Sequence, residues 1–130
     1  MSDWNERIIR EFRANGGELR GEGDTFLLLL TTTGRKSGQT RTTPLAYKLD
    51  GDRYIVVASF RGAPKHPDWY LNLVAHPQVT LEVGKETFNA IATTVESSER
   101  ERLLEQWPVV KEHQTLTTRE IPFVALQRVN

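Results

Sequence analysis

The stretch FLLLLTTTGRKSGQTRTTPLAYKLDGDRYIVVAS, residues 26–59, decides the fold that the sequence predicts. It opens on a short apolar run that ends in three threonines, so length and flanking residues favour a buried strand over 26–32. Residues 42–49 and 53–59 flank Asp50-Gly51, the residue pair that a tight hairpin turn requires. We therefore expect three consecutive antiparallel strands.

Helices are expected around these strands. Apolar residues recur every fourth position over 3–15, which predicts an amphipathic N-terminal helix. A second, short helix starts near Pro67, which suits a first helical position, and ends before Pro77. A third opens at Ser98, where S-E-R-E fits a capping box, and Pro108 breaks or restarts it.

Strands over 79–83, 87–95 and 123–129 complete the predicted sheet. Short strands joined by tight turns, with helices inserted, indicate an α+β antiparallel barrel and not alternating βαβ units. A chain of 130 residues has room for one hydrophobic core, so residues 1–130 are expected to form a single domain.

Composition excludes several classes of function. Seventeen Lys plus Arg balance seventeen Asp plus Glu, which argues against broad attraction to nucleic acid. No cysteine is present, and the three histidines lack metal-ligand spacing, so a thiolate nucleophile or a metal site is not expected. Without a long apolar run or a signal peptide, the chain is expected to be cytoplasmic; attachment of the N-terminal helix to a membrane surface is a minor alternative.

The first candidate site is the turn G-R-K-S-G at 34–38. Glycines let backbone N–H groups face a ligand, and Arg and Lys supply charge, which together suit a phosphate or carboxylate. Taken alone, a solvated basic turn is about as plausible. The candidate anion ligands are Arg35, Lys36, Ser37 and Arg41.

The second candidate site runs from Ala58-Ser59 to the helix start at 66–73. Free N–H groups at a helix start favour negative or carbonyl oxygen, and Trp69 offers a flat apolar wall for a ring system. The plain alternative is that Trp69 fills the core and Asn72 only bridges or caps backbone groups.

A third segment, 113–122, is a polar connection before the last strand. Gln114 and Arg119 are candidates to hydrogen-bond a carbonyl edge of a ligand. From spacing alone, a helix C-terminus stabilised by Arg119 is the favoured alternative.

Jointly and in this order, TTGRKSGQTRTTPL at 32–45, HPDWYLNL at 66–73 and the 114–122 segment resemble the deazaflavin (F420)-dependent nitroreductases of actinobacteria, also described as F420H2-dependent quinone reductases. The resemblance covers nearly the whole chain. It implies a split β-barrel of the flavin-reductase and pyridoxamine-phosphate-oxidase-like type, with reduced coenzyme F420 as hydride donor to a small quinone-like, nitro or other electron-poor acceptor.

The resemblance also implies roles for individual residues. The coenzyme phosphate and acidic tail would be held by Arg35, Lys36, Ser37 and Arg41, with Pro44 and Leu45 beside them. The deazaflavin ring would be framed by Ala58, Ser59, Pro67, Trp69, Tyr70, Asn72 and Gln114. Ser59 and Gln114 would polarise the ring or the acceptor.

Residues 109–118 depart from the family pattern, because they lack the tyrosines that the nitroimidazole-activating nitroreductase has there, which puts nitroimidazole reduction in question. An FMN-binding oxidoreductase of the same fold and a non-catalytic F420 carrier are the alternatives. A homodimer is expected by family analogy. The sequence does not identify the electron acceptor.

Overall fold

The computed structural model describes residues 3–21 and 25–129. Within these ranges, six strands form a closed, fully antiparallel barrel in the order β1-β2-β3-β6-β5-β4. The strands are β1 (Phe26–Thr33), β2 (Thr40–Asp50), β3 (Arg53–Val57), β4 (Gln78–Val83), β5 (Glu86–Thr94) and β6 (Phe123–Arg128). The predicted split antiparallel barrel with inserted helices is confirmed.

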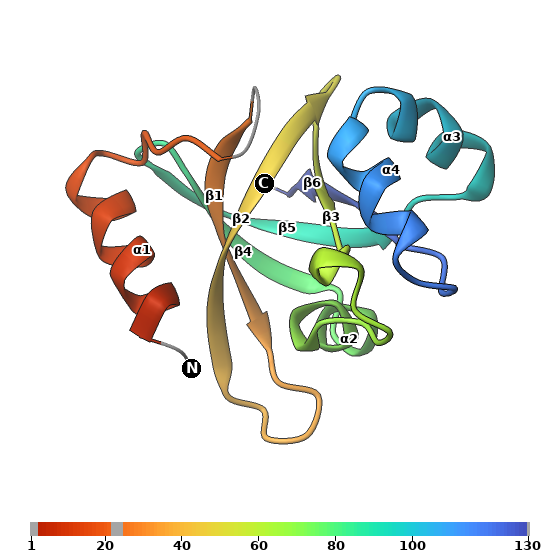
Figure 1. Cartoon of the computed structure of the whole chain (residues 1–130). Helices are drawn as coiled ribbons and strands as arrows, with labels where there is room; N and C mark the ends of the chain where they lie inside the picture. Colours follow the sequence, from red (N-terminus) through yellow and green to blue (C-terminus); the bar gives the residue numbers. More distant parts are fainter. Residues whose placement is uncertain (1–2, 22–24, 130) are drawn as a thin grey trace.

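In the described part of the chain, four α-helices and one 3-10 turn surround the barrel, and Figure 1 shows α1 on one side and α3 and α4 on the other. These elements are α1 (Asp3–Ala14), η1 (Phe60–Gly62), α2 (Asp68–Ala75), α3 (Ser97–Glu105) and α4 (Pro108–Thr115). The helix α2 lies near the end of the barrel from which the β1–β2 turn projects (Figure 1).

Alternation along the strands divides the apolar residues between the inside and the outside of the barrel. Leu28, Leu30 and Leu81 belong to the interior cluster, together with apolar residues of β3, β5 and β6. Leu29 points the other way and packs under Phe12 of α1. A third cluster lies under α3 and α4, where Trp107 meets Phe123 with ring centroids 6.2 Å apart.

Most predicted elements are present with boundaries shifted by one or two residues. The predicted strand over 42–49 begins earlier, because the β1–β2 ladder continues to the pair Thr33–Thr40. The strand predicted over 53–59 ends at Val57. There the Ala58 N–H donates to the Pro122 carbonyl and the chain turns into η1.

The predicted capping box at Ser98 is wrong. Helix α3 begins at Ser97, and its N-cap residue Glu96 makes no side-chain capping bond. Pro108 restarts a helix, since it is the first residue of α4, where its missing N–H costs nothing. The first three residues of the segment predicted as a polar connection, 113–115, therefore belong to α4.

Candidate functional site

The cationic turn between β1 and β2 is fastened to α2 by one buried amide. Asn72 is only 3% exposed, and its Oδ1 accepts from the Arg35 backbone N–H at 3.1 Å and from Arg35 Nη1 at 2.9 Å. Arg35 Nη2 also lies 3.4 Å from the Asp68 carboxylate at the start of α2. Arg35 thus positions the turn, whatever contact its remaining N–H groups make with a ligand.

The turn itself closes through its own backbone, and this leaves cationic side chains free. The Gly34 N–H donates to the Gln39 carbonyl at 2.8 Å, and the Gly38 N–H donates to the Gly34 carbonyl at 2.9 Å. Lys36 and Arg41 are exposed, and neither forms an ion pair within the described ranges. Lys36 on the turn and Arg41 on β2 are thus two cations without a carboxylate partner in these ranges, the kind of group that an anion needs.

The segment after β3 carries an unusual backbone. Ala58 is fully buried, and Ser59 precedes η1. Phe60 has a φ of +47°, in the left-handed region that residues other than glycine rarely adopt, although its side chain is 53% exposed. Such strain persists only where the surrounding contacts hold it, and it often marks a functional site.

Arg119 supplies those contacts. Its guanidinium donates to three carbonyl oxygens of this segment: from Nη1 to Ala58 at 3.1 Å, from Nη2 to Ser59 at 2.7 Å and from Nε to Ala63 at 2.8 Å. None of these acceptors belongs to α4, so the favoured interpretation that Arg119 stabilises a helix C-terminus is wrong. Burial lowers the pKa of Arg119, and no carboxylate pairs with it in the described part of the chain.

His66 connects the same arginine to the start of α2. Its Nδ1 lies 3.0 Å from Arg119 Nη1, and its ring centroid lies 4.9 Å from that of Tyr70. The sequence patterns predicted neither this contact nor the role of Arg119 in joining these segments. Most partners of Arg119 are backbone carbonyls far away in the sequence, and such contacts produce no recognisable residue spacing.

The predicted ring-framing residues of α2 lie against the barrel. Pro67 is buried and is the N-cap residue of the helix. Trp69 and Tyr70 are half-buried against the interior cluster, with their ring centroids 6.4 Å apart. The Tyr70 hydroxyl is 3.0 Å from Thr94 Oγ1, which ties α2 to β5. Trp69, with no polar partner among the described residues, keeps the flat apolar surface that its predicted role needs.

Pro44 and Leu45, predicted to line the coenzyme groove, are neighbours on β2. They pair with Leu29 and Leu28 of β1, and successive strand residues point to opposite faces. Leu45 packs on the interior cluster, whereas Pro44 shares the outer face with Leu29. We therefore expect only one of the two to face any single ligand.

Both polar atoms of the Gln114 side-chain amide form hydrogen bonds within the protein. Its Oε1 accepts from Arg100 Nη2 at 2.7 Å and from the Ile121 N–H at 3.0 Å. Its Nε2 donates to the Arg119 carbonyl at 2.7 Å and more weakly to that of Thr117. Gln114 thereby shapes the loop that carries Arg119; its polarising role stays a prediction, as does that of Ser59.

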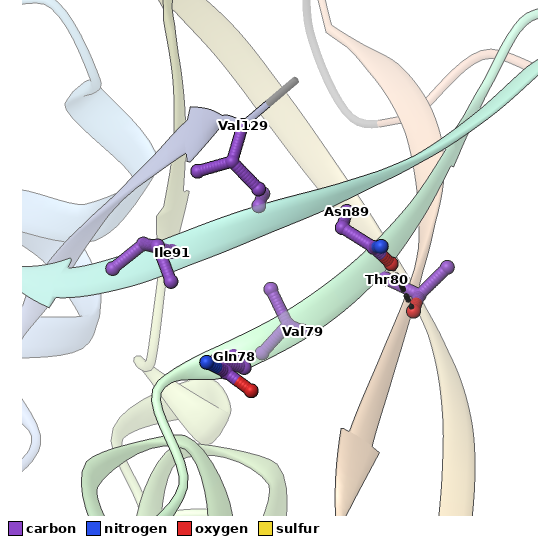
Figure 2. A pocket seen from close by; sticks show the side chains of 7 residues that line it. Gln78, Val79, Thr80, Asn89, Ile91 and Val129 are labelled. Carbon is purple, nitrogen blue, oxygen red and sulfur yellow. Dashed lines mark hydrogen bonds between the residues drawn. The ribbon is translucent and has the colours of Figure 1, made fainter.

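A surface hollow of about 360 Å³ lies elsewhere on the molecule, on β4 and β5 (Figure 2). Thr80 and Asn89, whose side chains are 3.3 Å apart, lie at one end and Gln78 and Val129 line other parts. Neither lysine nor arginine lines it, so it does not fit an acidic coenzyme. None of the predicted site residues is found there.

No helix within the described residues is long and apolar enough to cross a membrane. In the same ranges, no group of three or more His, Cys, Asp or Glu side chains is placed to hold a metal ion.

The comparison with protein families identifies the chain's relatives. The sequence over residues 4–128 matches the model of the F420H(2)-dependent quinone reductases. The chain belongs to this family. The F420H(2)-dependent quinone reductase Rv1261c of Mycobacterium tuberculosis is 42% identical in an alignment of 127 positions, which covers 90% of this chain and 85% of the relative. The chain is therefore an F420H2-dependent oxidoreductase, and coenzyme F420 is its cofactor, as the sequence predicts.

Solved structures agree with this assignment. The F420-H2 dependent reductase FDR-A superposes with a TM-score of 0.69 at 39% identity, over 78% of this chain and 93% of that chain. A domain-swapped dimer matches with a TM-score of 0.72 at 34% identity, over 96% and 98%. A Listeria innocua structure named for pyridoxamine 5'-phosphate oxidase matches with a TM-score of 0.58 at 12% identity, over 98% and 95%, which shows the shared fold alone.

The residues present fit the coenzyme of this family. An acidic, phosphate-bearing tail needs cations without internal partners, and Lys36 and Arg41 provide them. A planar ring needs an apolar wall beside hydrogen-bond donors. Trp69 supplies the wall, and the Ser59 N–H, which makes no hydrogen bond within the described residues, is such a donor.

Proposed function

We propose that this reductase transfers a hydride from reduced F420 to a small quinone-like acceptor. One observation carries the proposal: two separate segments are bonded to α2 or to its start. Asn72 of α2 binds the cationic turn. His66, just before α2, contacts Arg119, which in turn bonds to the Ala58-Ser59 segment. The proposed anion site and the proposed ring site are thus both connected to α2. The quinone class rests on the family and on the activity for which the mycobacterial relative is named.

The proposed roles of the residues follow from this arrangement. Lys36, Ser37 and Arg41 bind the phosphate and the acidic tail, while Arg35 holds the turn in place and adds charge. Trp69 and the backbone of Ser59 orient the ring. The coenzyme, when bound, supplies the hydride, so the protein has to provide orientation, exclusion of water and hydrogen bonds.

The phosphate assignment is tested by removing its two free cations. The double variant K36A/R41A loses two charge-assisted contacts, each worth about 1.5–3 kcal/mol, so the dissociation constant for oxidised F420 should rise at least tenfold. Fluorescence titration measures it. R10A/K85A is the matched control, because Arg10 and Lys85 are also exposed, lie outside the turn and carry the same charge. Equal affinity in both double variants would contradict the assignment.

Binding and turnover measurements on the unmodified protein distinguish this proposal from two alternatives. An FMN enzyme of this fold would bind flavin mononucleotide tightly and F420 weakly in parallel titrations. A non-catalytic F420 carrier would bind the coenzyme yet show no steady-state oxidation of reduced F420 when quinones are added. We expect tight F420 binding and turnover.

We also propose that the protein assembles as a homodimer. Support comes from the similar structure described as a domain-swapped dimer. Sedimentation velocity over a hundredfold range of protein concentration should give the mass of two chains. A mass of one chain, 14.9 kDa, across the range would contradict it.

A further inference from the structure

The contact between Arg119 and His66 fixes where the histidine carries its proton. A guanidinium has five N–H donors and no acceptor. Because Arg119 Nη1 lies 3.0 Å from His66 Nδ1, that nitrogen has to accept the hydrogen bond. A neutral imidazole protonated at one nitrogen then bears its hydrogen on Nε2.

The surroundings of His66 keep the ring neutral. Burial lowers its pKa, and the positive charge of Arg119 lowers it further. The ring of Tyr70, a second titratable group, packs against the imidazole. No carboxylate bonds to the imidazole in the described part of the chain, so nothing there stabilises a second proton.

The second ring nitrogen of His66 is left without a partner by these contacts. Arg119 Nη1 bonds both to His66 and to the Ala58 carbonyl, and Nη2 bonds to the Ser59 carbonyl, so the imidazole lies beside this segment. His66 Nε2 has no hydrogen-bond partner among the described residues, and the residue is only partly buried. An oriented donor without a protein partner at this position suits a carbonyl oxygen of a ligand.

We propose that His66, held by Arg119 as the Nε2–H tautomer, donates a hydrogen bond to a carbonyl oxygen of the ring bound beside Ala58 and Ser59. This inference rests on the proposed function. Both the deazaflavin and a quinone carry such carbonyls. His66 keeps its proton, and Arg119 is a positioning residue. A fixed donor of this kind is useful where the oxygen gains negative charge during hydride transfer.

The tautomer is tested first, without any ligand. Long-range ¹⁵N–¹H spectra of protein labelled in its histidines distinguish the two ring nitrogens. We expect the His66 Nδ1 signal to be that of an unprotonated nitrogen and Nε2 to be protonated at pH 7. A proton on Nδ1 at pH 7 would overturn the proposal, and it would do so whether or not the protein binds F420.

The ligand contact is tested on the same sample. Adding oxidised F420, and then menadione as a small quinone, should shift the His66 Nε2–H signal and slow its exchange with water. A shift with F420 alone places the bond on the coenzyme; a shift only after menadione places it on the acceptor. No shift with either, in protein that binds F420 by fluorescence titration, would overturn the proposal. Failure to bind F420 at all would instead contradict the proposed function.

Substitutions provide the functional test. H66F keeps a flat ring but removes the donor, so it should weaken F420 binding, or lower kcat/KM for menadione, at least tenfold. H66Q retains an N–H donor and an acceptor for Arg119, and should recover most of that loss. H76F is the matched control, because His76 ends α2 and is exposed. Equal loss in H66F and H66Q would reduce His66 to a structural role and contradict the proposal.

Discussion

At the scale of single residues, the site depends on polar side chains that fasten backbone segments. Asn72 and Arg119 both act in this way: each bonds to backbone groups far away in the chain. Asn72 was predicted as a coenzyme contact with backbone bridging as its alternative, and the structure shows the bridge. The side-chain amide of Gln114, similarly, is hydrogen-bonded by Arg100 and by backbone groups of the segment that follows α4. Their predicted contacts with the coenzyme remain to be tested.

Replacing Asn72 by alanine should loosen the cationic turn. The change leaves the Arg35 N–H and guanidinium without their acceptor and opens a small cavity, which should lower the free energy of unfolding by about 1–3 kcal/mol. F420 binding should weaken as well, because the turn is no longer held on α2. Urea denaturation and fluorescence titration measure the two effects.

Asn89 offers the matched control for that variant. It is exposed, and among the described residues its side chain bonds only to Thr80, so N89A should change stability by less than about 0.5 kcal/mol and leave F420 binding unaltered. If N72A behaved like N89A in both measurements, Asn72 would not be holding the turn.

At the scale of elements, the position of α1 on the barrel depends on the glycine turn that follows the helix. Gly17 follows the helix at a φ of +79°, and its N–H donates to the Phe12 carbonyl at 2.8 Å. A Cβ built on Gly17 would lie 1.8 Å from the Gly84 carbonyl oxygen in the β4–β5 turn. The sequence predicts a stop at this glycine, but the close approach of two turns depends on the tertiary structure.

The variant G17A should therefore be strongly destabilised. Alanine at this φ costs about 1 kcal/mol, and the overlap with Gly84 adds to it by forcing α1 away from the barrel. G51A is the control, since Gly51 has a φ of +65° but nothing within 4 Å of its Cβ position. Thermal unfolding should show a clearly larger decrease in Tm for G17A than for G51A. Equal decreases would mean that the close approach of Gly17 to Gly84 does not contribute to the loss of stability.

At the scale of the whole molecule, a charge cluster links the barrel to the helices that cover it. Asp50, in the β2–β3 hairpin, accepts from Arg102 on α3 and from Arg53, which also reaches Glu99 of α3. Hydrogen bonds from Arg102 and then Arg53 lower the pKa of Asp50 from 3.8 to about 2. This carboxylate therefore stabilises the folded protein only while it is charged.

The pH dependence of global stability follows from that shift. A lowered folded-state pKa means that the contribution of Asp50 is fully present above about pH 4 and is lost as the pH falls toward 2. D50N should thus be less stable than the parent protein in urea at pH 6, and the difference should shrink between pH 4 and pH 2.5. A difference that stayed constant with pH would show that the cluster acts through packing and not through charge.

The sequence by itself determined the barrel, its hairpins, the family and the gathering of cations at 35–41, because strand alternation, turn residues and local charge are properties of neighbouring positions. It did not determine that α2 joins the two halves of the site. That depends on Asn72 meeting Arg35 and on Arg119 meeting the 58–66 segment. Only the tertiary structure decided these contacts, since a buried amide or guanidinium takes whichever backbone groups the closed barrel brings within reach.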